Sequence, residues 1–166
     1  MKAYRRKCRG SAITEAGPAL FLLLVIIFFP MLDFIEMGAA YIFSSIFHDY
    51  VIRELAVSAP PGVTDTAIQS KDQAIAKIKK NFQDSSFYNF LKMSPNDLSV
   101  DEVKYYDASG TEVTDTSKLP VTVQCKTTCT IQPFISIPWW GQCPGLNAPF
   151  PFIQSSQRPQ EEKGRN

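Results

Sequence analysis

Two sets of residues in this chain of 166 amino acids have side chains that could do chemistry: a lone carboxylate, Glu15, and three cysteines in the C-terminal half. Glu15 lies between a basic head and an apolar run at residues 16–32. A carboxylate at the edge of a membrane segment is costly, so it usually serves a purpose. Position alone leaves two roles open: assembly, or a place at the interface where the helix dipole and Arg9 stabilise the charge.

The cysteines Cys125, Cys129 and Cys143 favour a structural disulfide, because they lie in the part of the chain that we expect to be exported to an oxidising compartment. Cys125 could pair with Cys129 across a hairpin, or Cys129 with Cys143, and the spacing leaves both pairings open. A metal site is disfavoured, since C-x₃-C is unusual for zinc and the one histidine, His48, lies on the N-terminal helix. No cofactor is expected.

Catalysis is not expected. A hydrolase needs a nucleophile with a base, or paired carboxylates in a cleft, and the sequence shows neither pattern and no phosphate-binding loop. Asp97, Asp101 and Glu102 cluster without a histidine or cysteine neighbour that would complete a metal site. Residues 1–10 hold five Lys/Arg, and the remainder holds twelve Lys/Arg against sixteen Asp/Glu, so no basic patch indicates a nucleic-acid partner.

The elements that position these residues begin with a membrane segment. The 17 apolar residues 16–32 reach ~25 Å, which suffices for a bilayer core when Ser11, or Phe34 and Ile35, are included. A secretory signal removed near Ala40 is the alternative interpretation. The positive head predicts a cytoplasmic N-terminus and export of everything after about residue 35.

The helical pattern continues beyond the apolar run to about Val57, and a Pro-Pro-Gly segment from Pro60 ends it. Pro30 removes the bond to the carbonyl of Ile26 and should kink the helix. The prediction is one long helix over residues 11–57. Its first half lies in lipid, and its second half packs on a domain or on neighbouring subunits.

This order of features resembles a known family. A basic leader, Gly10, Glu15, an apolar helix and the stretch 33–41 that follows it are together similar to the TadE-like pseudopilins of the tight-adherence (Tad/Flp) pilus system. The resemblance covers residues 5–57, and three residues match the family's juxtamembrane motif: Glu36, Gly38 and Tyr41. It implies a minor pilin or pilus-assembly protein of the bacterial inner membrane with a periplasmic domain. The implied partners are membrane lipid, other pilins, the Tad assembly machinery and a prepilin peptidase.

The resemblance also implies processing. The peptidase would cut between Gly10 and Ser11, so that Glu15 becomes the fifth residue of the mature chain. Ser11 would then carry a free ammonium group, and a buried ammonium and a buried carboxylate each cost several kcal/mol unless they are paired. Glu15 would neutralise the N-terminus of its own or an adjacent subunit, and so act as a register device for assembly.

The rest of the chain predicts a small α+β domain over residues 62–153, followed by a disordered polar tail at 154–166. Ser70 and Gln73 have the spacing of a capping box, which starts a short helix. The complete fold is therefore a long N-terminal transmembrane helix that continues into an exported domain with a short helix and an antiparallel sheet of three or four strands.

The strands are predicted from alternating apolar residues. One is expected at residues 98–106, followed by a turn in which Gly110 takes a positive φ. Two more, at 121–125 and 129–132, are expected to form a hairpin with a loop at 126–128.

Two classes of function remain. The first is a TadE-like minor pseudopilin that initiates or supports pilus assembly and could enter the surface fibre. The second is a single-pass membrane-anchored periplasmic scaffold or binding protein whose leader is never cut. Cleavage after Gly10 separates the two, and so does Glu15→Ala, which should impair assembly only in the first class.

Overall fold

The computed structural model describes residues 11–58, 70–94, 96–113, 122–133, 135 and 143–161, with side chains from residue 16 onward. Gly10, the side chain of Glu15 and the end of the predicted tail, 162–166, lie outside the described residues. The helices are α1 (Ser11–Leu23), the π-helical segment η1 (Leu24–Phe28), α2 (Phe29–Val57), α3 (Lys71–Gln83) and α4 (Ser86–Phe90). The strands are β1 (Leu98–Tyr106), β2 (Thr122–Ile131) and β3 (Phe150–Pro159).

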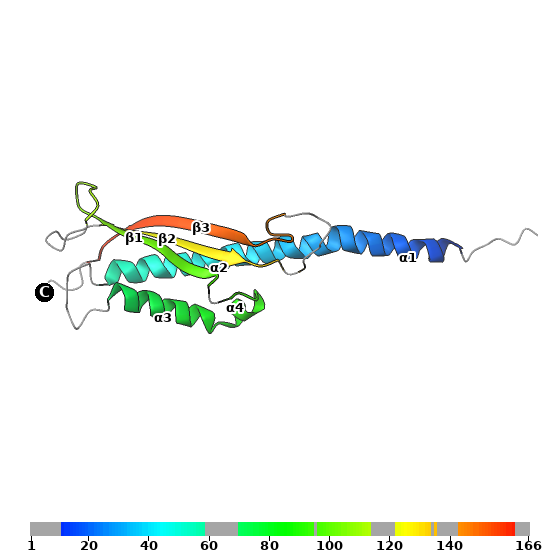
Figure 1. The fold of residues 1–166 in the computed structure, drawn as a ribbon, viewed down its shortest axis with the longest axis horizontal. Coiled ribbons are helices and arrows are strands. Elements are labelled where there is room, and N and C mark those ends of the chain that lie inside the picture. Colours follow the sequence, from blue (N-terminus) through cyan, green and yellow to red (C-terminus); the bar gives the residue numbers. More distant parts are fainter. Residues whose placement is uncertain are drawn as a thin grey trace, which may run out of the picture.

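The first three segments, α1, η1 and α2, form one long helix that runs through the whole molecule (Figure 1). The π-helical segment ends just before Pro30, where the N–H of Phe29 bonds to the carbonyl of Leu24. A widened turn makes room for a proline ring, which clashes with the carbonyl four residues earlier in a regular α-helix. The disturbance predicted at Pro30 therefore takes the form of a π-helical segment, and the predicted long helix is confirmed.

The sheet is antiparallel and has three strands in the order β1-β2-β3, in agreement with the prediction of three or four. β1 occupies the predicted residues 98–106 and pairs with β2, placing Leu98 opposite Cys129, with a bulge after Val100. β3 pairs with the other edge of β2 over its full length, with Ile131 opposite Phe150. The turn after β1 contains Gly110 with φ of +78°, as predicted.

The predicted hairpin at residues 121–132 is wrong. β2 runs unbroken through the expected loop at 126–128, and its odd-numbered residues are buried at every second position. Thr127, which was assigned to the loop on account of its polarity, is 1% exposed and faces the helix. A continuous alternation with period two is the signature of a single half-buried strand, and Thr127 does not interrupt it.

The predicted disordered tail is also wrong over residues 154–159, because they form most of β3. These residues are polar, and every second one is partly buried. The inward side chains of Gln154 and Ser156 bond to polar side chains of α2, which gives a polar strand a place in the fold. The folded domain therefore extends to at least residue 159 rather than ending at 153.

The second half of α2 is the centre of the domain. In Figure 1 the sheet runs along one side of α2, and α3 with α4 runs along another. The core is built from α2, β1, β2, α3, α4 and the turn after α4. Its largest fully buried apolar side chains are Phe47, Val51, Leu55, Leu91, Leu98 and Val123. A helix surrounded in this way cannot show a single apolar stripe, because it is buried on more than one side.

The start of α3 confirms the predicted capping box. The hydroxyl of Ser70 accepts from the N–H of Gln73, and the side chain of Gln73 accepts from the N–H of Ser70. The next helix, α4, starts in the same manner, since the hydroxyl of Ser85 accepts from the N–H of Tyr88.

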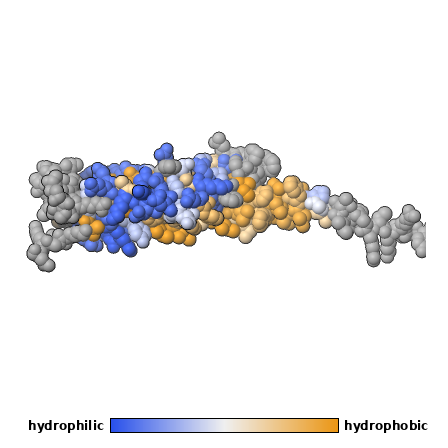
Figure 2. All heavy atoms as spheres, turned by 90° about the horizontal axis from the view of Figure 1, so that it is seen from below, coloured by the Kyte–Doolittle hydropathy of each residue, from blue (hydrophilic) through white to orange (hydrophobic). Residues whose placement is uncertain are grey.

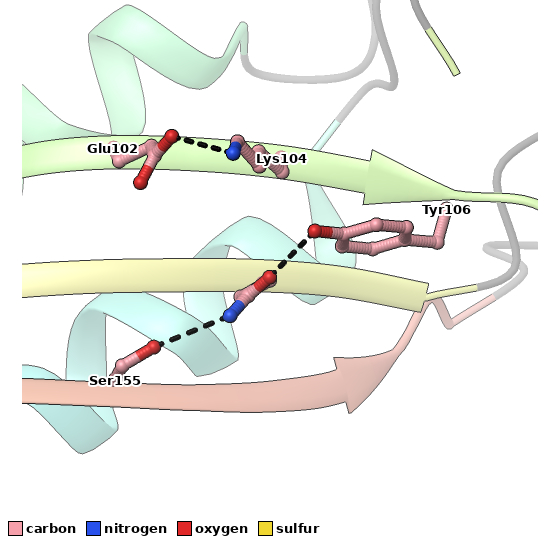
Figure 3. A network of polar contacts seen from close by, with 5 residues as sticks. Glu102, Lys104, Tyr106 and Ser155 are labelled. Carbon is pink, nitrogen blue, oxygen red and sulfur yellow. Dashed lines mark hydrogen bonds and ion pairs between the residues drawn. The ribbon is translucent and has the colours of Figure 1, made fainter. Parts of the chain in front are cut away.

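The outer face of the sheet is polar. The hydroxyl of Tyr106 on β1 donates to Gln124 on β2 over 2.7 Å, and Gln124 donates to Ser155 on β3 over 3.3 Å (Figure 3). Lys104 and Glu102 form an ion pair of 2.7 Å on the same face. Such exposed contacts align the three strands and contribute little to stability.

Candidate functional site on the long helix

The first half of the long helix exposes large apolar side chains around its whole circumference. They are Leu20, Phe21, Leu22, Leu23, Leu24, Ile26, Ile27, Phe28 and Met31. Over residues 16–57, this is the one helix in the described part of the chain that is long and apolar enough to cross a membrane. Figure 2 shows the division, with hydrophobic surface over this half and hydrophilic surface over most of the domain.

The length of the helix limits how much of it lipid can cover. Its 42 residues from Ala16 to Val57 reach ~63 Å, twice the ~30 Å of a hydrocarbon core. The ~20 residues that a core can hold end near Ile35 when counted from Ala16. Everything on α2 beyond that point belongs to the domain.

Two buried carboxylates mark the point where the domain begins. Asp33 and Glu36 lie one helical turn apart on the same side of α2, and both are buried. Oδ1 of Asp33 accepts a hydrogen bond of 3.1 Å from the backbone N–H of Ile135, which belongs to the segment between β2 and β3. Because a buried carboxylate is costly unless it is hydrogen-bonded, this contact fastens that segment to the helix at a fixed height.

The loop before β3 touches the helix one turn further along. Gly145 has φ of +84°, in the left-handed region that favours glycine. A Cβ on Gly145 would collide with the sulfur of Met37 on α2. Among the hydrogen bonds that close the loop are those from the N–H of Gly145 to the carbonyl of Ala148 and from the N–H of Cys143 to the side chain of Asn147. Its conformation therefore favours glycine at position 145, and a side chain there would also have to displace the end of the Met37 side chain.

His48 joins α2 to two strands at once. Its Nδ1 lies 2.8 Å from the hydroxyl of Thr127 on β2, and its Nε2 lies 2.7 Å from the hydroxyl of Ser156 on β3. Burial lowers the pKa of His48 below the ordinary 6.5, and the negative charge of Asp49 opposes this in part. The imidazole is therefore neutral at pH 7, with one ring nitrogen donating and the other accepting. The sequence analysis gave His48 no role.

Two further polar contacts extend the seam between α2 and the C-terminal strand. The side chain of Gln154 donates to the hydroxyl of Ser45 over 2.8 Å, and that of Gln160 donates to the carbonyl of Ser58 over 2.9 Å. Together with the contacts of His48 they form a row that we call the polar seam. Because the polar seam runs along much of α2, it prevents the domain from rotating about the helix and from sliding along the helix axis.

An open apolar groove of about 590 Å³ lies between α2 and the pair α3 and α4. Its walls are Ile42, Phe43, Ile46, Tyr50, Ile78, Asn81, Phe82, Ser85 and Phe87. Phe82 is at its centre and makes edge-to-face contacts with Phe43 and Tyr50. The groove contains no acid, base or nucleophile beyond one serine hydroxyl, so its chemistry is that of a docking surface.

The structure does not bring the predicted juxtamembrane motif together into one site. Glu36 is buried against the domain, whereas Gly38 lies on the open side of α2 with free space beyond its Cα. Tyr41 is half exposed and packs edge-to-face against Phe152 of β3. Of the predicted processing residues, Ser11 is the first residue of α1.

The predicted disulfides are absent, since Cys125, Cys129 and Cys143 are free thiols. Cys125 and Cys129 are four residues apart on one extended strand, which separates their Cα atoms by ~13 Å, whereas a disulfide requires less than ~7 Å. Their pairing is wrong because the hairpin that it required does not exist. Burial raises the pKa of both thiols to about 12, so they remain protonated and pack as small apolar groups.

Among the described residues, no three His, Cys, Asp or Glu side chains gather where they could hold a metal ion. No protein-family model, no curated protein and no solved structure matches the chain. The candidate site is therefore defined by geometry alone. It consists of a bare apolar half-helix, the contacts that fix the domain to the other half, and the groove beside it.

Proposed function

We propose that this chain is a TadE-like minor pseudopilin, held in the bacterial inner membrane by residues 11–35 with its domain in the periplasm, and acting in assembly of a Tad/Flp-type pilus. The observation that carries the proposal is the division of one continuous helix. Its first half is bare and apolar, and its second half is the centre of the domain. The residue-level resemblance at Gly10, Glu15 and the 36–41 stretch supplies the family.

The heights of the contacts support this arrangement. From Ser11 to Asp33 the helix rises ~33 Å, close to the ~30 Å of a hydrocarbon core. The hydrogen bond between Asp33 and Ile135, which joins the helix to the domain, would then lie at the outer membrane surface. A subunit built in this way has no flexible joint between its anchor and its domain along α2. Movement of the helix during assembly would carry the domain with it.

Glu15 would act at the other end of the helix. Cleavage after Gly10 gives Ser11 a positive ammonium group inside or at the edge of the bilayer. The carboxylate four residues away can neutralise that charge in its own chain or in a neighbour, and the neighbouring case fixes the relative height of two subunits.

The first test is the N-terminal residue of the protein isolated from its native membrane, read by mass spectrometry. A start at Ser11 supports prepilin-type processing, and Gly10→Leu should then leave the full-length precursor in the membrane. A start at Met1 would shift the function to an unprocessed periplasmic scaffold. A start near Tyr41 would show that the apolar run is a secretory signal and would overturn the anchored model.

The second test addresses assembly. Glu15→Ala should reduce the yield of sheared surface filaments, because the charge of Ser11 loses its partner, while the amount of processed subunit in the membrane stays unchanged. Thr14→Ala is the matched control, one residue away and neutral, and should leave the yield unaltered. Equal yields from the wild type and Glu15→Ala would rule out the register role.

A further inference from the structure

The exposed side of α2 carries an apolar stripe that extends well beyond the reach of the bilayer. The stripe consists of Ile35, Ile42, Ile46 and Tyr50, spaced at seven, four and four residues along one side of the helix. Ile42 is 59% exposed and Ile46 is 45% exposed, although both belong to the part of α2 that is built into the domain. In Figure 2, hydrophobic patches also continue along the lower edge of the domain.

Lipid cannot cover this stripe. If the hydrocarbon core ends near Ile35, then Ile46 lies ~16 Å and Tyr50 ~22 Å beyond it along the helix. The headgroup layer on one side of a bilayer is only ~5–8 Å thick, so both side chains stand in water above it. A continuous apolar surface of this kind on a soluble domain is the mark of a protein contact.

We propose that a second copy of this chain covers the apolar stripe, forming a parallel, in-register helix pair. The proposal rests on the membrane anchoring given above, because two copies in one membrane share the same orientation. A parallel two-fold pair places each residue of the stripe opposite its own counterpart at the same height. The apolar stripe of one copy therefore packs against the equally long apolar stripe of the other. Each stripe covers the part of α2 that the domain of the other copy leaves exposed.

The charges beyond the stripe fit such a pair. Asp49 and Arg53 follow Ile46 on the same side of α2, at steps of three and four residues, and both are exposed. Neither forms a salt bridge with a described residue of its own chain. In a parallel pair each Asp49 lies one helical turn below the partner's Arg53, within reach of its long side chain, so two symmetric ion pairs would close the end of the stripe.

The shape of the surface also admits a helix. Gly38 lies between Ile35 and Ile42 with free space beyond its Cα, which lets another backbone come close. Ile42 and Ile46 form one wall of the apolar groove, so the neighbouring helix would border the groove and cover part of it. Tyr41, by contrast, faces β3 through its contact with Phe152 and lies away from this surface.

Cysteine cross-linking in native membranes tests the pairing. In a chain with Cys8→Ser and Cys143→Ser, which keeps the two buried core cysteines, Ile42→Cys is treated with copper phenanthroline. The expected result is a shift from the monomer band to a band of twice its mass. Tyr41→Cys is the matched control, since it is equally exposed at nearly the same height, and it should remain monomeric.

Two outcomes overturn the pairing. Equal cross-linking of Ile42→Cys and Tyr41→Cys would mean random encounter in the membrane. A cross-linked product of any other mass would assign the stripe to a different protein. Alkaline carbonate extraction of the same samples separates the two proposals: a chain that stays in the membrane without pairing contradicts this inference alone, whereas a chain released by carbonate contradicts the anchoring and the pairing together.

Discussion

Replacement of His48 by leucine should destabilise the domain more than any single exposed contact could. The change removes hydrogen bonds to Thr127 and Ser156, and it leaves the Thr127 hydroxyl, 1% exposed, without its histidine partner. The bond to the partly buried Ser156 contributes about 1 kcal/mol, and the Thr127 hydroxyl left unsatisfied in the core costs about 1–3 kcal/mol, so the expected loss is about 2–4 kcal/mol. Chemical unfolding of the full chain in mild detergent, followed by near-ultraviolet circular dichroism, measures it.

A double-mutant cycle identifies the cause of the loss. Thr127→Val alone also removes the hydrogen bond between His48 and Thr127. In the His48→Leu background, Thr127→Val instead removes a buried hydroxyl that has already lost its histidine partner. The double variant should therefore be more stable than His48→Leu by about 1–2 kcal/mol, because two apolar groups replace a broken polar pair. Strictly additive losses would contradict the hydrogen bond between helix and strand.

The same residue predicts a dependence on pH. Since the pKa of His48 is lowered in the folded protein, the unfolded chain takes up a proton first as the pH falls below 6.5. The contribution of His48 to stability is complete above pH 6.5 and declines as the pH falls towards the folded pKa, by at most about 1.4 kcal/mol per pH unit and so by no more than about 2 kcal/mol at pH 5. The chain has one histidine, so the decline that His48 causes below pH 6.5 should be missing in His48→Leu. A flat wild type, or an equal slope in the variant, would refute the buried neutral imidazole.

Two further predictions concern the glycines and the thiols. Gly145→Ala should lose more than the about 1–2 kcal/mol that a left-handed alanine costs, whereas Gly110→Ala, with a similar φ and open space around it, should lose only that amount. Thermal melts compare the two variants, and equal losses of stability would show that the contact between the loop and the helix adds nothing to the cost of the substitution. In the folded protein, alkylation at pH 8 should reach the half-buried Cys143. At Cys125 and Cys129 it should be about a thousandfold slower than at an ordinary thiol, because a pKa of about 12 leaves these two side chains with little thiolate. Peptide mapping measures this, and rapid labelling of either core cysteine would contradict its position.

The elements predicted correctly are those with local causes. The capping box at Ser70 and the positive φ at Gly110 depend on a few neighbouring residues, and the structure contains both. The long helix followed from its composition and from the Pro-Pro-Gly segment at its end. The strand at 98–106 followed from alternating apolar residues. These features need no knowledge of what packs against them.

The errors in the sheet come from polar residues whose partners are distant in sequence. Thr127 resembled a loop residue because the partner of its hydroxyl, His48, is 79 positions away. A signal was nonetheless present, since apolar or small residues occupy every second position from 123 to 131 without a break in period. The hairpin interpretation gave more weight to the polarity of three residues than to that period, and the predicted Cys125–Cys129 disulfide inherited the mistake.

The strand β3 could not be found from hydrophobicity at all, and the reason bears on function. Its inward residues Gln154 and Ser156 bond to Ser45 and His48, so the β3 edge of the sheet is held to α2 by the polar seam, beside the apolar core that joins β1 and β2 to the helix. Hydrogen bonds with defined partners admit one register, whereas apolar contacts discriminate less between registers two residues apart, which bury the same face of the strand. A subunit whose helix must transmit its height to a domain requires such a unique register. Further apolar side chains of α2, those of Ile42, Ile46 and Tyr50, remain exposed, and a second copy of the chain can cover them.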